Sequence, residues 1–334
     1  MVRFTVIGAG SWGSAMAYYL GRLGFNTKLW VREEEVLADL VQTRINHTFL
    51  PDFEFPVTVT FHKTLAEAIE GNRVIFVAVP SQFCRQIYER MDEYLTKEQL
   101  IVSLTKGLEQ KTFKTMTEVM EEVFDSSRKM RLAVLSGPSF AREVAAGHPT
   151  ALVLASRDQT LARELQKTIS SRQLRIYTST DVIGVELGGA VKNVIAIAAG
   201  ISVGLGYGHN SRATLITRGL VEITRLGQAV GARKETFYGL AGLGDLVLTC
   251  TSELSRNYRV GLELARGKSL KQILSEMKMV AEGVRNTLTV HKLAHHKKIE
   301  MPICQQIYEV LYLGKPAHKA LEDLMSRSLK EEKV

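Results

Sequence analysis

The first residues of this chain place the strongest constraint on its fold. A short apolar run at Phe4–Ile7 leads directly into GAGSWG at residues 8–13, and a helical pattern at Ser14–Leu23 and a second apolar run at Thr27–Trp30 follow. A strand, a G-x-G-x-x-G turn, a helix and a second strand are typical of a dinucleotide-binding unit, and this context disfavours a glycine turn without a ligand. The glycines allow a tight turn and close backbone approach, while the helix N-terminus supplies N–H donors to the pyrophosphate.

The rest of the first half continues this alternation of apolar runs and amphipathic stretches. We expect further strands at Val57–Thr60, Val74–Val79, Leu100–Leu104, Leu132–Leu135 and Ala151–Ala155. We expect helices at Leu65–Ile69, Gln82–Tyr94 and Phe113–Val123. This order is typical of an α/β fold with a doubly wound parallel sheet. After residue 181, helical patterns rich in Ala, Gly and Leu replace the strands, so we expect an α/β domain at 1–185 and an all-α C-terminal domain at 186–334.

Composition excludes several other classes of protein. A chain of 334 residues with 45% hydrophobic and 23% charged residues is an ordinary globular protein of about two domains. The cysteines, Cys84, Cys250 and Cys304, lie far apart without a C-x-x-C pair, which argues against a disulfide scaffold or a cysteine zinc site. The strand at Phe4–Ile7 leaves no room for a signal peptide, so we expect a cytoplasmic protein.

The positive charge suits an anionic partner, small molecules included, and indicates no more than the partner's sign. The net charge of +8 is dispersed, without a basic patch or a nucleic-acid-reading motif, so we expect no nucleic acid. Val194–Tyr207 has no charged residue, but a membrane span needs about 20 apolar residues, so we expect a buried helix and no stable membrane insertion. His291 and His295, four positions apart, share a helix face and His296 follows, but there is no H-E-x-x-H pattern or obvious nearby carboxylate, so we expect an exposed basic helix and no metal.

The end of the second strand bears on the choice of cofactor. An arginine there accommodates the 2′-phosphate of NADP, whereas an acidic residue binds the ribose 2′-hydroxyl of NAD. Arg32 comes first and Glu33 follows at once, so the two side chains compete for this position. A solvated surface arginine is a further alternative. We expect NADPH and leave NADH open.

Polar residues also follow other apolar runs, where α/β folds bind their ligands. Such residues occur at Pro80–Ser81, Thr105–Gly107 and Gly137–Ser139. Lys192 is the most informative, because it lies on a helix between Gly188-Gly189 and the apolar run VIAIAA. Since a buried lysine is costly unless it is paired or its pKa falls, we expect Lys192 to face a cleft and to act as an acid or base. The alternative is a side chain that extends to the surface from a half-buried helix.

A glycine-dense stretch, GLAGLGD at 239–245, ends in Asp245. A further set of polar residues, Ser255, Arg256 and Asn257, follows it along the chain. Ser255 is expected to cap a helix at Asn257–Ala265. Arg256 and Asn257 at this helix start combine guanidinium, amide and backbone N–H groups, which suit an anion. An ordinary capped helix with a solvated arginine explains the same pattern, and the spacing leaves both interpretations open.

Six motifs together resemble one known family over essentially the whole chain. They are GAGSWG at 8–13, TKGLE at 105–109, SGPSFAREVAAGHPTA at 136–151, VKNV at 191–194, GLAGLGDL at 239–246 and SRN at 255–257. This combination resembles the bacterial NAD(P)-dependent glycerol-3-phosphate dehydrogenases. The resemblance implies a Rossmann-type N-terminal domain, a helical C-terminal domain and the reversible reduction of dihydroxyacetone phosphate to sn-glycerol 3-phosphate, a precursor of glycerophospholipids. It further implies direct hydride transfer without a metal or a covalent intermediate.

The resemblance also implies roles for single residues. Lys192 exchanges a proton with the oxygen at C2 of the substrate, a small phosphorylated three-carbon molecule, and Lys106 lies near both substrate and nicotinamide. The other implied substrate contacts are Gly137, Ser139, Asp245, Ser255, Arg256 and Asn257, the last two with Ser255 on the phosphate side. The implied cofactor positions include the three glycines of the loop. They are Gly8, Gly10, Ser11, Trp12, Gly13, Arg32, Lys106, Ala141, Arg256, Val280 and Glu282. A homodimer is compatible with this assignment.

Two positions depart from the family pattern, and two rival functions remain. His209 stands where the family has an aspartate, and Arg285 where it has a small residue. The first rival is another Rossmann dehydrogenase with a hydroxyacyl or sugar-acid substrate. The second is a non-catalytic NADP-binding regulator, which has no need for Lys106, Lys192 and Asp245 together.

Overall fold

The computed structural model describes residues 2–277, 281–329 and 331–332. By its internal contacts the chain divides into two units: unit 1 comprises 1–105 and 114–182, and unit 2 comprises 106–113 and 183–334. Unit 2 therefore takes in a short segment that lies between two parts of unit 1 in the sequence. The boundary expected between residues 185 and 186 stays a prediction.

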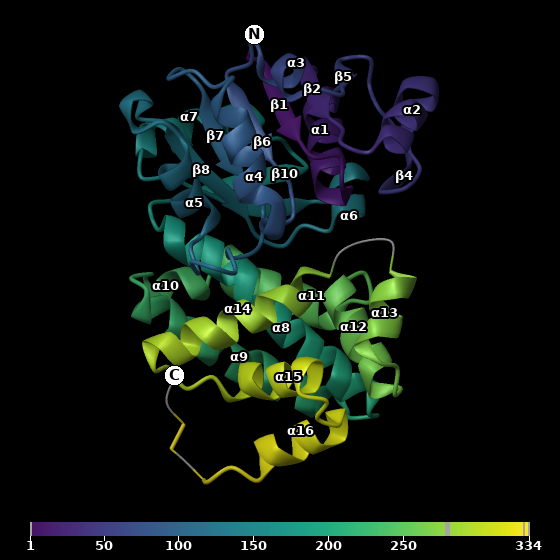
Figure 1. The fold of residues 1–334 in the computed structure, drawn as a ribbon, viewed down its shortest axis with the longest axis vertical. Helices are drawn as coiled ribbons and strands as arrows, with labels where there is room; N and C mark the ends of the chain where they lie inside the picture. The colour runs from purple at the N-terminus through teal and green to yellow at the C-terminus, as the bar shows by residue number, and fades with distance from the viewer. Residues whose placement is uncertain (1, 278–280, 330, 333–334) are drawn as a thin grey trace. The chain divides into compact units, whose positions relative to one another are not determined.

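Unit 1 is built on a twisted sheet with helices on both faces (Figure 1). Within the described residues the sheet has eight strands in the order β10-β9-β8-β7-β6-β1-β2-β5. The strands are β1 (Phe4–Ile7), β2 (Thr27–Trp30), β5 (Val59–His62), β6 (Val74–Val77), β7 (Leu100–Ser103), β8 (Arg131–Ser136), β9 (Thr150–Ala155) and β10 (Leu174–Ser179). A short hairpin, β3 (Ile45–Asn46) and β4 (Leu50–Glu54), lies outside this sheet. The α/β fold expected from the alternation of strands and helices is confirmed.

Alternate residues of the central strands supply the two apolar cores of unit 1. In β1, Phe4 and Val6 pack into the core that contains α1 (Ser11–Arg22), α2 (Glu34–Thr43) and α7 (Gln159–Ile169). Ile7 packs into the opposite core, with α3 (Leu65–Ile69), α4 (Ser81–Asp92) and α5 (Met116–Val123). Because both faces are covered, the central strands are apolar throughout, as in parallel sheets generally.

One pair of strands departs from the expected parallel arrangement. β8 and β9 run antiparallel, with Leu135 opposite Leu154, and β10 then runs parallel to β9. The short helix α6 (Ala141–Ala145) follows β8, and β9 begins soon afterwards, which leaves no long crossover helix to return the chain to the opposite edge. A parallel connection needs about a dozen or more residues, usually with a full helix.

Some element bounds differ from the sequence expectations for local reasons. The strand expected at Val57–Thr60 is β5, and it begins later because Val57 is an exposed residue after Pro56. The helix expected from Phe113 begins at Met116, because Thr115 forms a capping box with Glu118.

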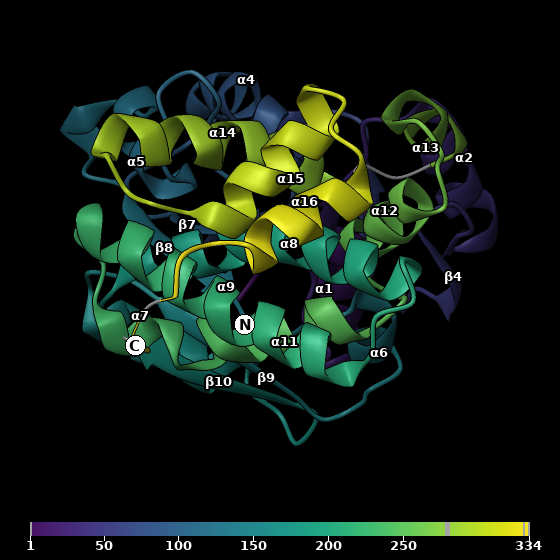
Figure 2. The same ribbon diagram turned by 90° about the horizontal axis from the view of Figure 1, so that it is seen from below.

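Unit 2 is all-helical within its described residues and is packed around one long apolar helix. This helix is α8 (Val182–Gly204), and α9 (His209–Ala229), α12 (Arg256–Ala265), α14 (Glu282–Lys297) and α15 (Pro302–Tyr312) contribute to the same core. The remaining helices are α10 (Lys234–Phe237), α11 (Asp245–Thr251), α13 (Leu270–Glu276) and α16 (Ala317–Met325). Helix α14 packs against α15, and α15 packs against α16, along one side of the unit (Figure 2).

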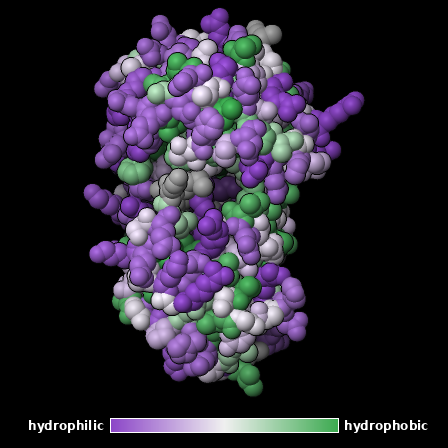
Figure 3. Space-filling model, turned by 90° about the vertical axis from the view of Figure 1, so that its right-hand side faces the viewer, coloured by the Kyte–Doolittle hydropathy of each residue, from purple (hydrophilic) through white to green (hydrophobic). Residues whose placement is uncertain are grey.

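The apolar helix α8 has the length and hydropathy of a membrane span but lies inside unit 2. Among the described residues it alone passes this test, and 94% of its most apolar window is buried in the structure. Gly200 and Gly261 let α8 and α12 cross closely, because a β-carbon on either would overlap a backbone carbonyl of the other helix. The buried helix expected at Val194–Tyr207 is thus confirmed as part of α8, which begins earlier. On the face drawn in Figure 3, hydrophilic residues predominate and hydrophobic residues form small scattered groups.

Candidate active site

The glycine turn between β1 and α1 has the geometry that its sequence predicts. Gly8 has φ +108°, a left-handed conformation that other residues rarely adopt. A β-carbon on Gly13 would overlap the carbonyl oxygen of Gly8, so this residue allows the turn and the helix to approach closely. Gly10 is the N-cap of α1, and no side chain caps the helix there. A β-carbon on Gly10 would meet nothing within 4 Å, so open space lies beside this backbone.

The structure around this turn fits a dinucleotide. Backbone N–H groups at the start of α1 and the positive end of the helix dipole are suited to a pyrophosphate. Trp12 lies in the first turn of α1, and its buried indole N–H has no hydrogen-bond partner within the described parts of the chain. Buried donors are usually paired in folded proteins, so this unpaired donor in the first turn of α1 fits a site for a ligand.

Arg32 follows β2, and its side chain contacts Glu33 and the ring of Phe83. Its side chain is 57% exposed, and its Nη2 lies 2.6 Å from a carboxylate oxygen of Glu33. The guanidinium also lies 5.5 Å from the ring centre of Phe83. Arg32 is therefore an exposed arginine, but one whose position is fixed by an ion pair and an aromatic ring.

The segment after β8 carries three of the predicted contacts. Gly137 has φ +134°, and the hydroxyl of Ser139 donates to the carbonyl oxygen of Gly137 at 3.0 Å. Ala141 is the first residue of α6. All three belong to unit 1, and their predicted contacts with substrate and cofactor stay predictions.

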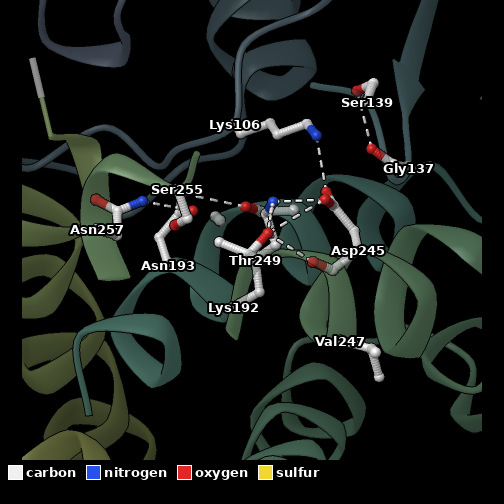
Figure 4. Close-up of polar contacts among 12 residues, drawn as sticks. Lys106, Gly137, Ser139, Lys192, Asn193, Asp245, Val247, Thr249, Ser255 and Asn257 are labelled. Atoms are coloured by element: carbon white, nitrogen blue, oxygen red, sulfur yellow. Dashed lines mark hydrogen bonds and ion pairs between the residues drawn. The ribbon is translucent and has the colours of Figure 1, made fainter. Parts of the chain in front are cut away.

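Two lysines of unit 2 share one buried carboxylate (Figure 4). Nζ of Lys192 donates to Oδ1 of Asp245 at 2.6 Å, and Nζ of Lys106 donates to Oδ2 of the same residue at 2.7 Å. Lys192 also donates to the hydroxyl of Thr249 at 2.7 Å. Lys192 is 5% exposed and Asp245 is 1% exposed. The alternative that Lys192 extends to the surface is therefore wrong.

This environment changes the acidity of Lys192. Its pKa is lowered from 10.5 to about 8: burial is the main cause, Asp245 opposes the change, and the charge of Lys106 contributes to it. Since an acid or base acts best when its pKa lies near the working pH, this value suits a group that gives and takes a proton. The neighbouring thiol differs, because burial raises the pKa of Cys250 to about 12 and keeps it protonated.

An unusual turn of helix brings Asp245 to α8. The glycine-dense stretch forms a π-helix at Leu240–Gly244, with Asp245 as the next residue and the start of α11. A β-carbon on Gly188 would lie 2.6 Å from the carbonyl oxygen of Ala241, so a glycine lets α8 approach this turn. Single π-helical turns of this kind are frequent at functional sites.

The start of α12 forms the other polar group. Ser255 caps the helix by accepting from the N–H of Tyr258 at 3.2 Å, which confirms the expected cap. Arg256 is partly buried, and burial lowers the pKa of its guanidinium while the charge of Glu282 raises it. Burial likewise raises the pKa of Glu282, and Arg256 opposes that change. Arg256 is therefore partly withdrawn from solvent and interacts electrostatically with Glu282, while its predicted phosphate contact stays a prediction.

Asn257 has partners within the protein. Its Nδ2 donates to Oδ1 of Asn193 at 2.8 Å, and its Oδ1 accepts from the N–H of Gly283 at 2.9 Å (Figure 4). Asn257 thereby joins the residue after Lys192 to the start of α14. The predicted contact between Asn257 and the substrate stays a prediction.

Sequence reasoning missed two residues of this cluster. Thr249 is four positions after Asp245, so the two lie on one face of α11, and this spacing was an available signal. Asn193 stands beside Lys192 in the VKNV motif, but nothing in the sequence pointed to Asn257 as its partner. Val280, a predicted cofactor contact, lies outside the described residues.

The residues outside this cluster have ordinary environments. His291 stacks on Tyr308 with ring centres 3.8 Å apart, and no group of three or more His, Cys, Asp or Glu in the described parts of the chain is arranged to hold a metal. Of the two departures from the family pattern, His209 contacts Arg212 at 2.8 Å and Arg285 is exposed. Cys84, Cys250 and Cys304 are buried free thiols.

Comparison with known proteins agrees with both units. Residues 3–162 match the family described as NAD-dependent glycerol-3-phosphate dehydrogenase N-terminus, and residues 181–322 match the corresponding C-terminus. The chain is 50% identical over 327 residues to the glycerol-3-phosphate dehydrogenase (NAD(P)+) of Syntrophotalea carbinolica, covering 98% of each chain. The protein of the same name from Koribacter versatilis is 50% identical over 329 residues, again covering 98% of each chain. The crystal structure of glycerol-3-phosphate dehydrogenase from Coxiella burnetii superposes with a TM-score of 0.94 at 40% identity, covering 98% of this chain and 99% of that chain. The chain therefore belongs to the NAD-dependent glycerol-3-phosphate dehydrogenase family.

Proposed function

We propose that this protein reduces dihydroxyacetone phosphate to sn-glycerol 3-phosphate reversibly with NADPH, and accepts NADH as well. The observation that carries this proposal is the buried cluster in which Lys106 and Lys192 share the carboxylate of Asp245. In this cluster Lys192 can donate a proton, and the ammonium of Lys106 is a second positive charge bound to the same carboxylate. Relatives about half identical over the full chain carry this activity in their names, which supports the proposal.

Lys192 is the proposed catalytic acid and base. In the direction of reduction, its ammonium gives a proton to the oxygen at C2 of the substrate as that oxygen gains negative charge. In the direction of oxidation, the neutral amine takes the proton back. A pKa of about 8 leaves both forms of Lys192 accessible near neutral pH, which a reversible proton transfer requires.

Lys106 and Asp245 support this transfer electrostatically. The ammonium of Lys106 stabilises the negative charge that develops on the substrate oxygen. Asp245 accepts a hydrogen bond from each lysine, at 2.6 Å and 2.7 Å, so it fixes the direction in which both ammonium groups point. Thr249 accepts a further bond from Lys192 and restricts the ammonium to one orientation.

Arg256 and the start of α12 are the proposed phosphate site, together with Ser255 and Asn257. A phosphate dianion there compensates the partly buried guanidinium and accepts from backbone N–H groups at the helix start. Binding of the phosphate then holds the ketone in place through contacts far from the reacting carbon, and such positioning contributes to the rate. Gly137 and Ser139 are the remaining proposed substrate contacts.

The nicotinamide cofactor, when bound, supplies or accepts a hydride. Its proposed contacts in unit 1 are Gly8, Gly10, Ser11, Trp12, Gly13, Arg32 and Ala141. Its proposed contacts in unit 2 are Lys106, Arg256 and Glu282, with Val280 outside the described residues. Arg32 favours NADPH, because its guanidinium suits the 2′-phosphate, but its ion pair with Glu33 has to rearrange to make that contact.

The proposed role in the cell is the supply of sn-glycerol 3-phosphate for glycerophospholipids in the cytoplasm. The direct test of the function is the oxidation of NADPH, and separately of NADH, by purified protein with dihydroxyacetone phosphate and with plain dihydroxyacetone. We expect turnover with the phosphate ester only. Turnover with a hydroxyacyl or sugar-acid substrate instead identifies another dehydrogenase, and NADPH binding without any turnover identifies a regulator.

A further inference from the structure

We propose that Asn286 is a positioning residue, whose side-chain amide ties the main chain at Lys106 to helix α8 and so fixes Lys106 against the Asp245–Lys192 pair. This inference rests on the proposed function of that pair. Asn286 lies in the second turn of α14 and is 1% exposed. Both of its hydrogen bonds go to backbone carbonyl oxygens and neither goes to an ionised side chain. Its effect on the reaction therefore passes through the backbone of Lys106.

The amide of Asn286 joins two segments that are distant in sequence. Its Nδ2 donates to the carbonyl oxygen of Lys106 at 3.2 Å and to the carbonyl oxygen of Ala190 at 3.1 Å. An amide nitrogen carries two hydrogens, so both acceptors are satisfied by one group. Ala190 precedes Lys192 by two residues on α8, so the tie links the backbones from which the two lysines extend.

Lys106 needs such a tie because its segment has no regular structure. Residues 106–113 form neither helix nor strand, so no ladder of backbone hydrogen bonds fixes them. Leu108 anchors the middle of the segment in the apolar core of unit 2. At its far end the ring of Phe113 lies 6.5 Å from the ring of His296, which also belongs to α14. Helix α14 thus contacts the segment at both ends, and Asn286 makes the contact at the catalytic end.

Helix α14 is itself aligned with α8 by a second amide. Asn257 accepts from the N–H of Gly283 at 2.9 Å and donates to Asn193 at 2.8 Å. The first turn of α14 is thereby joined to the residue that follows Lys192. The two amides, one on α12 and one on α14, hold the backbone frame, and Asp245 holds the two ammonium groups.

Without the donor of Asn286, the carbonyl oxygens of Lys106 and Ala190 each lose a hydrogen bond, the first part-buried and the second buried. The segment at Lys106 is then free to move relative to α8, and a shift of about 1 Å in such a site costs about 10²-fold in rate. A second consequence concerns proton affinity. The charge of Lys106 lowers the pKa of Lys192, so withdrawal of Lys106 raises that pKa.

The test compares two variants of the same buried helix. Asn286→Asp keeps the shape of the side chain but, when ionised, accepts hydrogen bonds only. Thr287→Val is the matched control, because Thr287 is equally buried and its hydroxyl donates within α14, to the carbonyl oxygen of Gly283 at 2.7 Å. For N286D we expect a kcat about 10²-fold lower, a higher KM for dihydroxyacetone phosphate and an upward shift of the alkaline limb of kcat/KM. For T287V we expect kcat and the pH profile of the wild-type protein.

A double-mutant cycle with Lys106→Ala separates the possible failures. If Asn286 acts through Lys106, N286D adds little to the loss already caused by K106A. Multiplicative losses, or an N286D protein with wild-type kcat and pH profile, overturn the inference. An unaffected K106A protein overturns it as well, whereas absence of turnover in the wild-type protein overturns the proposed function itself. If N286D does not fold, Asn286→Ser, which keeps one donor on a shorter side chain, takes its place in the same cycle with the same outcomes.

Discussion

Replacing Asp245 by asparagine removes the charge that holds Lys192 protonated. The substitution keeps the shape of the side chain, but the amide no longer attracts the ammonium of Lys192, 2.6 Å from the carboxylate oxygen. For charges about 4 Å apart at an effective dielectric constant of about 20, this attraction is about 4 kcal/mol. Loss of this attraction therefore lowers the pKa of Lys192 below its value of about 8.

The change in pKa translates directly into rate. Each unit by which the pKa of Lys192 falls below the working pH lowers its protonated fraction about tenfold, so we expect reduction of dihydroxyacetone phosphate to slow by more than about tenfold at pH 7.5. Above pH 7 the substrate phosphate is largely dianionic, because its second pKa is about 6. Changes in rate from pH 7 to 10 therefore report on the protein.

The assay is the pH profile of kcat/KM for the reduction, which reports on groups of the free protein. We expect the wild-type value to be flat below a pKa near 8 and to fall above it. For D245N we expect kcat/KM to fall steadily from pH 7 to pH 10. Asp323→Asn is the control, because it removes the same charge from an ion pair with Lys315 on the surface of unit 2. We expect this variant to keep the wild-type fall of kcat/KM above pH 8. A D245N protein within tenfold of wild type, with its limb still near pH 8, refutes the reasoning.

Three further predictions concern other parts of the molecule. Arg32→Ala raises KM for NADPH about 10- to 100-fold and leaves KM for NADH unchanged, because only NADPH carries the 2′-phosphate; equal effects on both contradict this role of Arg32. Gly13→Ala places a methyl group against the carbonyl oxygen of Gly8, so thermal melting and NADPH titration should show a loss of about 1–3 kcal/mol in stability together with weaker binding, and an unchanged protein argues against the close turn. Burial raises the pKa of Glu222 to about 7, so its contribution to stability, up to about 3 kcal/mol, is complete below pH 4.5 and is lost as pH rises to 7. Urea unfolding at pH 5 and pH 8 should show this loss in the wild-type protein and not in Glu222→Gln, and an identical pH dependence of the two rules it out.

The elements that sequence reasoning identified are those with a strong local pattern. The glycine turn before α1 was recognisable because three glycines at fixed spacing join a strand to a helix. The strand β10 (Leu174–Ser179) escaped notice because it is an edge strand with exposed Arg175 and Tyr177, so it lacks the apolar run of the central strands. The reversal of β9 was equally hidden, because the direction of a strand depends on the length and path of the preceding connection rather than on the strand itself.

The candidate site was predictable residue by residue but not as an arrangement. Lys192 was informative alone, because a charge within an apolar helix is costly unless it has a partner. Its partner Asp245 was identified separately, and the pairing of Asp245 with Lys106 joins residues 139 positions apart through the packing of the helices. Asn286 gave no signal at all, since an asparagine in a helix is ordinary until the carbonyl groups that it binds are known.

The central claim, that Lys192 transfers the proton, is tested most directly by Lys192→Ala and by Lys192→Met, which better preserves the volume of the side chain. Two quantities are measured on each folded variant: turnover of dihydroxyacetone phosphate at saturating NADPH, and the affinity for NADPH by fluorescence titration. We expect turnover to fall by about 10²–10⁴-fold, the usual contribution of a positioned acid, while NADPH binding changes little. Turnover within tenfold of the wild-type value in both variants would contradict the account and remove Lys192 from its role.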